Sequence, residues 1–143
     1  MTTTHVDGVL IAEAHCDGPC GVYDPASARI AAEAVLSMTK KLAALEMPSH
    51  DDRQAVAAYH NVFARYVAIK EEQAQLAKEE LLILWTDYFK PQHLSEFPDL
   101  HAIFWKAAKL CSACKVEISI DHANQLMDSI KRIHEVFWKS KGR

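Results

Sequence analysis

The 143-residue sequence lacks three features, each of which marks a class of protein. No apolar run approaches the roughly 20 residues of a membrane-spanning helix, so no membrane partner is expected. There is no excess of positive charge, because the formal net charge is −3, and this argues against binding to nucleic acid. No stretch alternates apolar and polar residues as a half-buried strand does. What remains is one domain in which 50% of the residues are hydrophobic, enough for a sizeable core.

The amino-terminal segment also lacks the pattern of a secretory signal. Residues 1–14 have no basic start, carry Asp7 and contain only a short apolar run at residues 8–12. Without a signal, the predicted location is cytoplasmic, where thiols stay reduced. That location disfavours a disulfide between Cys16 and Cys20 and leaves both thiols free to bind a metal.

Four segments with helical spacing of apolar residues predict an all-α fold, an antiparallel four-helix bundle. The second segment is long, and its apolar 4-3 alternation is interrupted by His60 and Lys70, which are expected to snorkel or pair at the edge of the seam. The first helix is predicted to start at Asp24 and Pro25 and to end before Pro48. Ser49 or Asp51 is the predicted cap of the second helix, and Pro91 stops it. Pro98 starts the third helix, and Ser119 caps the fourth, which Gly142 follows.

The expected core follows from the same spacing. Each helix contributes one apolar stripe, and the third stripe includes a Cys-x-x-C pair, Cys111 and Cys114. Because no second ligand pair is evident nearby, core packing is favoured there over a zinc or redox site. The predicted stripes are Ile30, Ala34, Val35, Met38, Leu42 and Leu45; Val56, Phe63, Val67, Ala74, Ala77, Leu81, Leu84 and Tyr88; Leu100, Phe104, Ala107, Cys111 and Cys114; and Leu126, Ile130, Ile133 and Phe137.

A short segment before the first helix carries most of the reactive side chains. Its glycines and proline interrupt any helix, so it is predicted to be a tight loop that brings two thiols toward one point. Thiolates and imidazole suit a transition metal. Zinc is one candidate, but histidine directly before a Cys-x-x-x-Cys spacing favours nickel or copper, which also accept backbone nitrogen. A disulfide, or a tail with chance cysteines, remains an alternative. The loop reads His15-Cys16-Asp17-Gly18-Pro19-Cys20-Gly21-Val22-Tyr23.

This loop, with Asp-Pro after it, resembles the nickel hook of the nickel-containing superoxide dismutases. Residues 85–91, Trp-Thr-Asp-Tyr-Phe-Lys-Pro, are similar to a second block of that family. The resemblance covers residues 15–143. It implies an enzyme that converts superoxide to dioxygen and hydrogen peroxide with one nickel ion per subunit, in a homohexamer. It also implies that residues 1–14 are a propeptide, which a processing protease removes to make His15 the amino terminus.

The resemblance further implies a division of the chain and a set of metal ligands. Residues 15–23 would form the hook and residues 24–143 the bundle. Nickel would be bound by the sulfurs of Cys16 and Cys20, by the backbone nitrogen of Cys16 and by the α-amine of His15. The His15 imidazole would be an axial ligand in the oxidised state.

Five more residues match positions around the nickel of the family. Tyr23 and Tyr88 match two phenols that order water or substrate at the open face, and Asp17 matches a residue that shapes the hook. Lys90 and Lys115 match lysines that guide the anion inward, a role that makes physical sense because an anionic substrate approaches a net-negative protein. The alternatives are ordinary ones: core or rim tyrosines, and solvated lysines.

The sequence also departs from the family pattern. Many members place a glutamate and an arginine around the axial imidazole, and the matching positions here are Ala31 and Gln73. Both are replaced together, as expected of two groups that act as one hydrogen-bonded unit. Gly18 replaces a leucine that is common elsewhere. These changes indicate another branch of the family rather than an inactive copy, and they leave open what orients the His15 imidazole.

Two rival functions use the same residues. One is a nickel or copper carrier that binds metal through the hook without turnover. The other is a structural bundle whose amino-terminal cysteines form a redox-sensing disulfide. Tyr23 and Tyr88 favour the enzyme over the carrier, because a carrier has no need of phenols over an open metal site.

Overall fold

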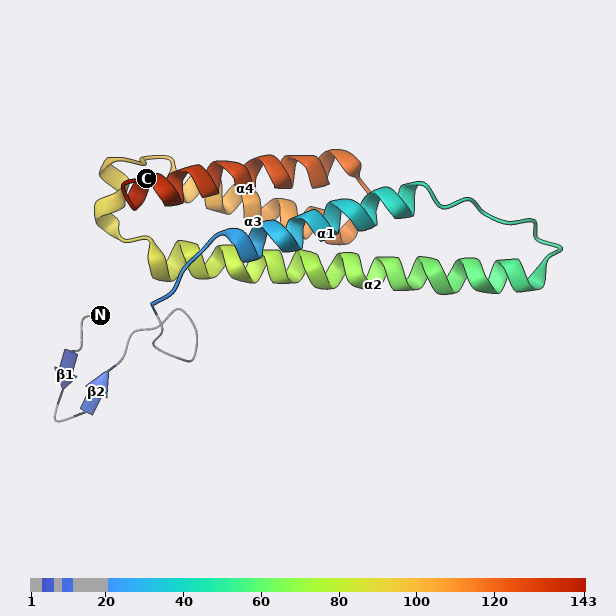
Figure 1. Ribbon diagram of the computed structural model, residues 1–143, viewed down its shortest axis with the longest axis horizontal. Helices are drawn as coiled ribbons and strands as arrows, with labels where there is room; N and C mark the ends of the chain where they lie inside the picture. Colours follow the sequence, from blue (N-terminus) through green and yellow to red (C-terminus); the bar gives the residue numbers. More distant parts are fainter. Residues whose placement is uncertain (1–3, 7–8, 12–20) are drawn as a thin grey trace.

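The computed structural model describes residues 4–6, 9–11 and 21–143. Four long helices form an antiparallel bundle in which each helix packs against the next, and the first also packs against the last (Figure 1). This confirms the predicted fold class. Within the described residues, no helix has the length and hydropathy to cross a membrane. The helices are α1 (Ala26–Ala43), α2 (Arg53–Ile83), α3 (Leu100–Val116) and α4 (Ile120–Ser140).

A short antiparallel hairpin precedes the bundle, which the sequence analysis did not predict. Strand β1 (Thr4–Val6) pairs with β2 (Val9–Ile11), with His5 opposite Leu10. The two runs are rich in β-branched residues, and Asp-Gly, a dipeptide typical of two-residue hairpin loops, separates them in the sequence. Because each run has only three residues, the pattern is too short for alternation to be recognised.

The connection between α2 and α3 contains two short helical segments. A π-helical turn η1 (Leu84–Tyr88) continues α2, and a 3-10 helix η2 (Pro91–Ser95) follows. The backbone N–H of Phe89 donates to the carbonyl of Leu84, 3.1 Å away, which closes the π turn. As predicted, Pro91 ends the helix, since Lys90 before it adopts the extended conformation that a following proline requires. Tyr88 is therefore the last helical residue before a sharp change of direction.

The predicted stripe of α1 is wrong in part, although Val35 and Leu42 are buried as expected. Ile30, expected inside, is 58% exposed, whereas Thr39 is buried and donates a hydrogen bond from its hydroxyl to the Val35 carbonyl. Small side chains make up half of the buried face, which lets the neighbouring helices approach closely. Those residues are weakly hydrophobic, so apolar spacing alone did not reveal them. The buried residues of α1 are Ala28, Ala31, Ala32, Val35, Thr39 and Leu42.

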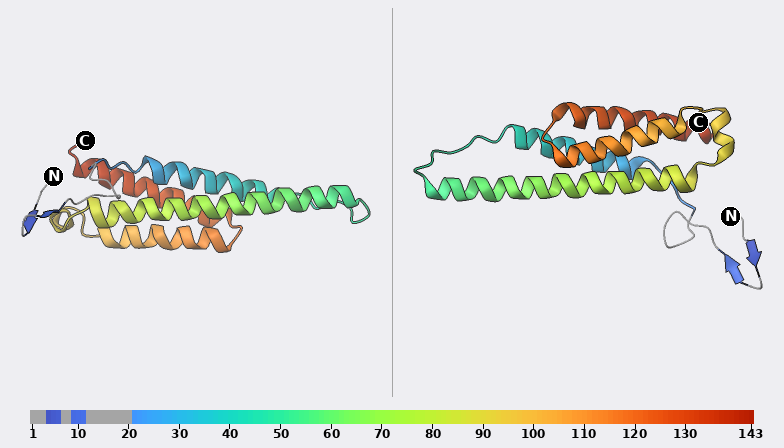
Figure 2. Two further views of the ribbon diagram at one scale, coloured as in Figure 1. Left: turned by 90° about the horizontal axis from the view of Figure 1, so that it is seen from below. Right: turned by 180° about the vertical axis from the view of Figure 1, so that it is seen from behind.

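Helix α2 begins at a different cap from the one expected and extends beyond the bundle. The side chain of Asp52, not Ser49 or Asp51, accepts a hydrogen bond from the Ala55 backbone N–H at 2.9 Å. Figures 1 and 2 show the amino-terminal half of α2 extending past α3 and α4. The seam residues of this half are therefore at most half-buried, and His60 is exposed. The predicted seam is fully buried only from Lys70 to Leu84, and Tyr88 at its end is half-buried.

Lys70 is not at the edge of the seam, as predicted, but is 2% exposed in the core. Its ammonium donates to the carbonyl oxygens of Cys114, Lys115 and Glu117, at the carboxyl end of α3. These carbonyls lack partners within the helix, and a cation there is favourable for the helix dipole. Burial lowers the pKa of Lys70, partly opposed by the neighbouring Glu71. Lys70 thus links α2 to the end of α3 and is part of the core.

The predicted core residues of α3 and α4 are confirmed. The α3 and α4 stripes are buried as expected, and Ser119 caps α4 by accepting a hydrogen bond from the backbone N–H of His122. Cys111 and Cys114 are both free and buried. No group of three or more histidine, cysteine or acidic side chains among the described residues could hold a metal ion, and this includes the surroundings of the two cysteines. Burial raises the pKa of the Cys111 thiol to about 12, and the neighbouring Cys114 adds to the rise.

We predict that Cys111→Ala and Cys114→Ala each lower the free energy of unfolding by about 1–2 kcal/mol through loss of a small buried group. The nickel content and dismutase activity of the folded protein should not change. Chemical denaturation, metal analysis and a superoxide assay on one sample check this. In the native wild type, neither thiol should react with an alkylating reagent at neutral pH, because the thiolate is the reactive form. A folded variant without activity would contradict a purely structural role.

Candidate metal centre

The segment that leaves the predicted hook is fixed to the end of α2 by two tyrosines. The ring centroids of Tyr23 and Tyr88 lie 5.4 Å apart, with the ring planes tilted by 55°. Directly after Tyr23, the Asp24 carboxylate accepts a hydrogen bond from the Ala26 backbone N–H at 2.8 Å, as expected for a helix-capping residue, and Pro25 is buried. The fold therefore brings together the two phenols that lie 65 positions apart in the sequence.

Tyr88 is held from several sides. Its ring packs on Phe137 of α4, with centroids 4.6 Å apart, and lies nearly parallel to the His93 ring, 5.9 Å away. Its hydroxyl oxygen lies 2.7 Å from the Oγ atom of Ser140. The ammonium of Lys141 lies 5.5 Å from the centre of the Tyr88 ring. The carboxyl-terminal turn of α4 thus contacts both the oxygen and the ring of this phenol.

The two lysines predicted to guide the substrate lie in different places. Lys90 is exposed and follows Tyr88 by two residues, at the same end of the bundle. Lys115 is in the last turn of α3, about 20 Å along the helix axis from its start at Leu100. Its ammonium contacts the side-chain oxygen of Gln75 on α2. Within one chain, the structure places Lys90 beside the phenols and does not bring Lys115 to them.

The remaining predicted positions divide into two groups. His15, Cys16, Asp17 and Cys20 lie outside the described residues. Ala31, the position of the missing glutamate, is buried in α1, and Gln73 is half-buried in α2.

Sequence reasoning missed Ser140 and Lys141 as neighbours of the site. It predicted only that the fourth helix ends before Gly142, because a contact across 52 residues leaves no signal in local spacing.

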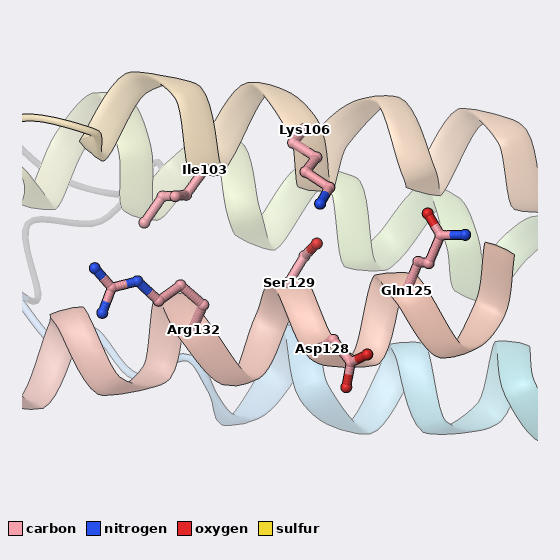
Figure 3. Close-up of a pocket in the computed structure, with 6 residues that line it drawn as sticks. All are labelled: Ile103, Lys106, Gln125, Asp128, Ser129 and Arg132. Carbon is pink, nitrogen blue, oxygen red and sulfur yellow. The ribbon is translucent and has the colours of Figure 1, made fainter. Parts of the chain in front are cut away.

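Grooves on the described surface offer alternative places for a metal site. One groove of about 210 Å³ lies between α3 and α4, and Figure 3 shows Lys106 and Ser129 pointing toward one another there while Asp128 points away. Another, of about 380 Å³, is lined by Trp85, Phe89 and Lys90, next to the phenols. Neither contains the soft donors of the hook, so neither competes with it as a transition-metal site.

Comparison with known proteins identifies the family. A family model described as nickel-containing superoxide dismutase matches residues 10–141. The chain belongs to this family. It is 42% identical over 128 residues to the nickel superoxide dismutase of Streptomyces seoulensis, an alignment that covers 90% of this chain and 88% of that protein. The corresponding protein of Streptomyces coelicolor is 40% identical over the same length, with the same coverage.

Solved structures agree. A crystal structure of nickel-containing superoxide dismutase with the nickel ligation of the oxidised state is 41% identical, with a TM-score of 0.77. A native nickel superoxide dismutase structure is 39% identical, with a TM-score of 0.76. In both cases the match covers 90% of this chain and all of the other. The predicted family, the superoxide dismutase activity and the nickel cofactor are thereby confirmed, and the carrier alternative is not favoured.

From the place of Lys90 we predict that Lys90→Glu lowers kcat/KM for superoxide by roughly two- to tenfold at low ionic strength, because it reverses a positive charge beside the phenols. The difference should shrink as salt is added, and nickel content should stay the same. Lys109→Glu on the exposed side of α3, where the ammonium lies over the Trp105 ring, is a control of equal net charge. Equal salt dependence of kcat/KM in wild type and both variants would show that Lys90 does not guide superoxide to the site.

Proposed function

We propose that this nickel superoxide dismutase carries out its reaction at a hook formed by His15, Cys16 and Cys20, adjacent to the phenols of Tyr23 and Tyr88. The observation that supports this is the contact between Tyr23, the last residue of the predicted hook, and Tyr88, whose ring centroids lie 5.4 Å apart. The donor set fits nickel, since thiolates, imidazole and an amine are the soft and borderline donors that nickel accepts.

The protein groups have separate tasks in this proposal. Nickel, when bound, supplies the one-electron couple by which superoxide is both oxidised and reduced. The two thiolates and the nitrogens of His15 and Cys16 hold it, and Asp17 shapes the loop. Tyr23 and Tyr88 order water or substrate next to it. Lys90 supplies local positive charge that attracts the anionic substrate.

The proposal extends to processing, assembly and location. Residues 1–14 are a propeptide whose removal exposes the α-amine of His15, and the mature chain, residues 15–143, assembles as a homohexamer in the cytoplasm. Exposed apolar side chains such as Ile30, Trp105 and Ile118, which are 58%, 60% and 46% exposed, are available for subunit contacts. A role for Lys115 at the hook requires a neighbouring subunit, because of its distance from Tyr88 within one chain. The molar mass of the nickel-loaded protein, measured by light scattering, tests the assembly.

The ligand assignment predicts the effect of removing each sulfur. Cys16→Ser and Cys20→Ser should each lose tightly bound nickel and dismutase activity, because a hydroxyl is a poor donor to nickel compared with a thiolate. Circular dichroism should show an intact helical bundle, since the hook precedes α1. Metal analysis after gel filtration gives the nickel content. Full activity in either variant would show that the hook is assigned to the wrong residues.

A second prediction concerns the amino terminus. An α-amine has an unperturbed pKa of about 8 and can offer its lone pair to a metal near neutral pH, whereas a peptide nitrogen within a chain is a weak, protonated donor. A chain that begins at His15 should therefore bind nickel and dismutate superoxide. The full 143-residue chain should fold as a helical bundle and be inactive.

The matched control is a chain with Ala14 retained before His15, which differs by one residue. All three proteins are loaded with nickel under reducing conditions and compared for nickel content and activity. If the Ala14 form is as active as the His15 form, the amine is not a ligand.

A further inference from the structure

The hydrogen bond between Tyr88 and Ser140 has a direction that the surrounding groups determine. The Oγ atom of Ser140 lies 2.7 Å from the carbonyl oxygen of Phe137 and 2.7 Å from the hydroxyl oxygen of Tyr88. Both distances are those of normal O–H···O hydrogen bonds. A serine hydroxyl has a single proton, and a carbonyl oxygen can only accept. The Ser140 proton is therefore donated to Phe137, and Tyr88 must be the donor in its own bond to Ser140.

We propose that Ser140 is a positioning residue that accepts the hydrogen bond of the Tyr88 hydroxyl. The Tyr88 oxygen can then interact with any other group only as a hydrogen-bond acceptor. This rests on the proposed function, in which Tyr88 orders water or substrate. An acceptor can order a water molecule or a protonated form of the substrate. It cannot donate to the superoxide anion, which has no proton to offer in return. Tyr88 therefore acts on the anion through a water molecule.

The position of Lys141 supports this division of roles. Lys141 directly follows Ser140 in the sequence. Its ammonium lies 4.9 Å from the centre of the Phe137 ring and 5.5 Å from the centre of the Tyr88 ring. At the carboxyl end of α4, the Ser140 hydroxyl thus accepts the hydrogen bond of the Tyr88 phenol, and the Lys141 ammonium lies near the Tyr88 ring. Attraction for an anion at this point comes from the lysine, and the phenol oxygen supplies the hydrogen-bond acceptor.

The structural explanation, that Ser140 only completes the end of α4, accounts for its bond to Phe137 but not for its contact with Tyr88. Ser140 and Tyr88 are both part-buried, where a hydroxyl without a partner is costly. The Tyr88 ring is also held in place, because it packs against Phe137 and His93. A rigid ring with one defined acceptor has one orientation of its O–H bond.

The test measures the hydroxyl proton directly. The full-length chain, without added metal, is labelled with carbon-13 at the tyrosine Cζ atoms and studied by NMR in an equal mixture of H2O and D2O. A hydroxyl that exchanges slowly gives two Cζ signals, one for the protonated and one for the deuterated form. Tyr88→Phe assigns the resonance. We expect two signals for Tyr88 in wild type, a single averaged signal in Ser140→Ala, and two again in Ser140→Thr, which keeps the hydroxyl. Two signals in Ser140→Ala, or one in wild type, would overturn the proposal.

The same substitutions are then compared in nickel-loaded enzyme that begins at His15, the form predicted to be active. Ser140→Ala should lower kcat severalfold with unchanged nickel content, and Ser140→Thr should restore it. If Ser140→Ala keeps the kcat of wild type across the pH range, Ser140 has no positioning role and the proposal fails. If the NMR result is as expected but no form of the chain dismutates superoxide, the assigned hydrogen bond holds and the proposed function fails instead.

Discussion

The contact between Tyr23 and Tyr88 is the interaction on which the candidate metal centre depends. It joins the last residue of the predicted hook to the last residue of the π turn, two positions that lie far apart in the sequence. An aromatic pair contributes only about 0.5–1.5 kcal/mol beyond the area it buries, so it cannot hold the hook in place alone. The capping bond of Asp24 and the burial of Pro25 fix the neighbouring backbone and make the geometry of the pair reproducible.

The bundle gives this contact a rigid support. The π turn ends α2 at the same end of the molecule at which α4 ends, so Tyr88 can be packed by Phe137 and bonded to Ser140. Toward the other end of α3, Lys70 binds three carbonyl oxygens and ties α2 to α3. A buried charge is tolerated only where it is hydrogen-bonded, and these three bonds explain why a lysine can occupy a seam position. Both ends of the long helix α2 within the bundle are thus restrained by polar contacts as well as by packing.

The sequence predicted the parts of the structure whose causes are local. The cap at Ser119, the stop at Pro91 and the stripes of α3 and α4 depend on spacing over a few residues. The errors have non-local causes. Ile30 was expected inside, but three alanines form half of the buried face of α1, because close helix packing favours small residues. The direction of the Ser140 hydrogen bond and the distance of Lys115 from the phenols both depend on how helices are arranged in space, and no local pattern contains that information.

The hook itself was predicted from the order and type of its residues, which carry donor chemistry directly. Its neighbourhood could be predicted only where the family pattern supplied it, as for Tyr88. Ala31 and Gln73 illustrate the limit: their match to the family's glutamate and arginine is a prediction from resemblance, and it does not say which group would orient the His15 imidazole here.

The burial of Cys111 and Cys114 has a consequence for the lifetime of the enzyme. Each turnover yields hydrogen peroxide, and peroxide oxidises the thiolate of cysteine, not the neutral thiol, to sulfenic acid. With the pKa of Cys111 raised to about 12 and that of Cys114 also raised by burial, both sulfurs stay protonated at neutral pH. A core that contains two oxidisable atoms is in this way protected from the product of its own reaction, and sulfur can fill space there without becoming a site of damage.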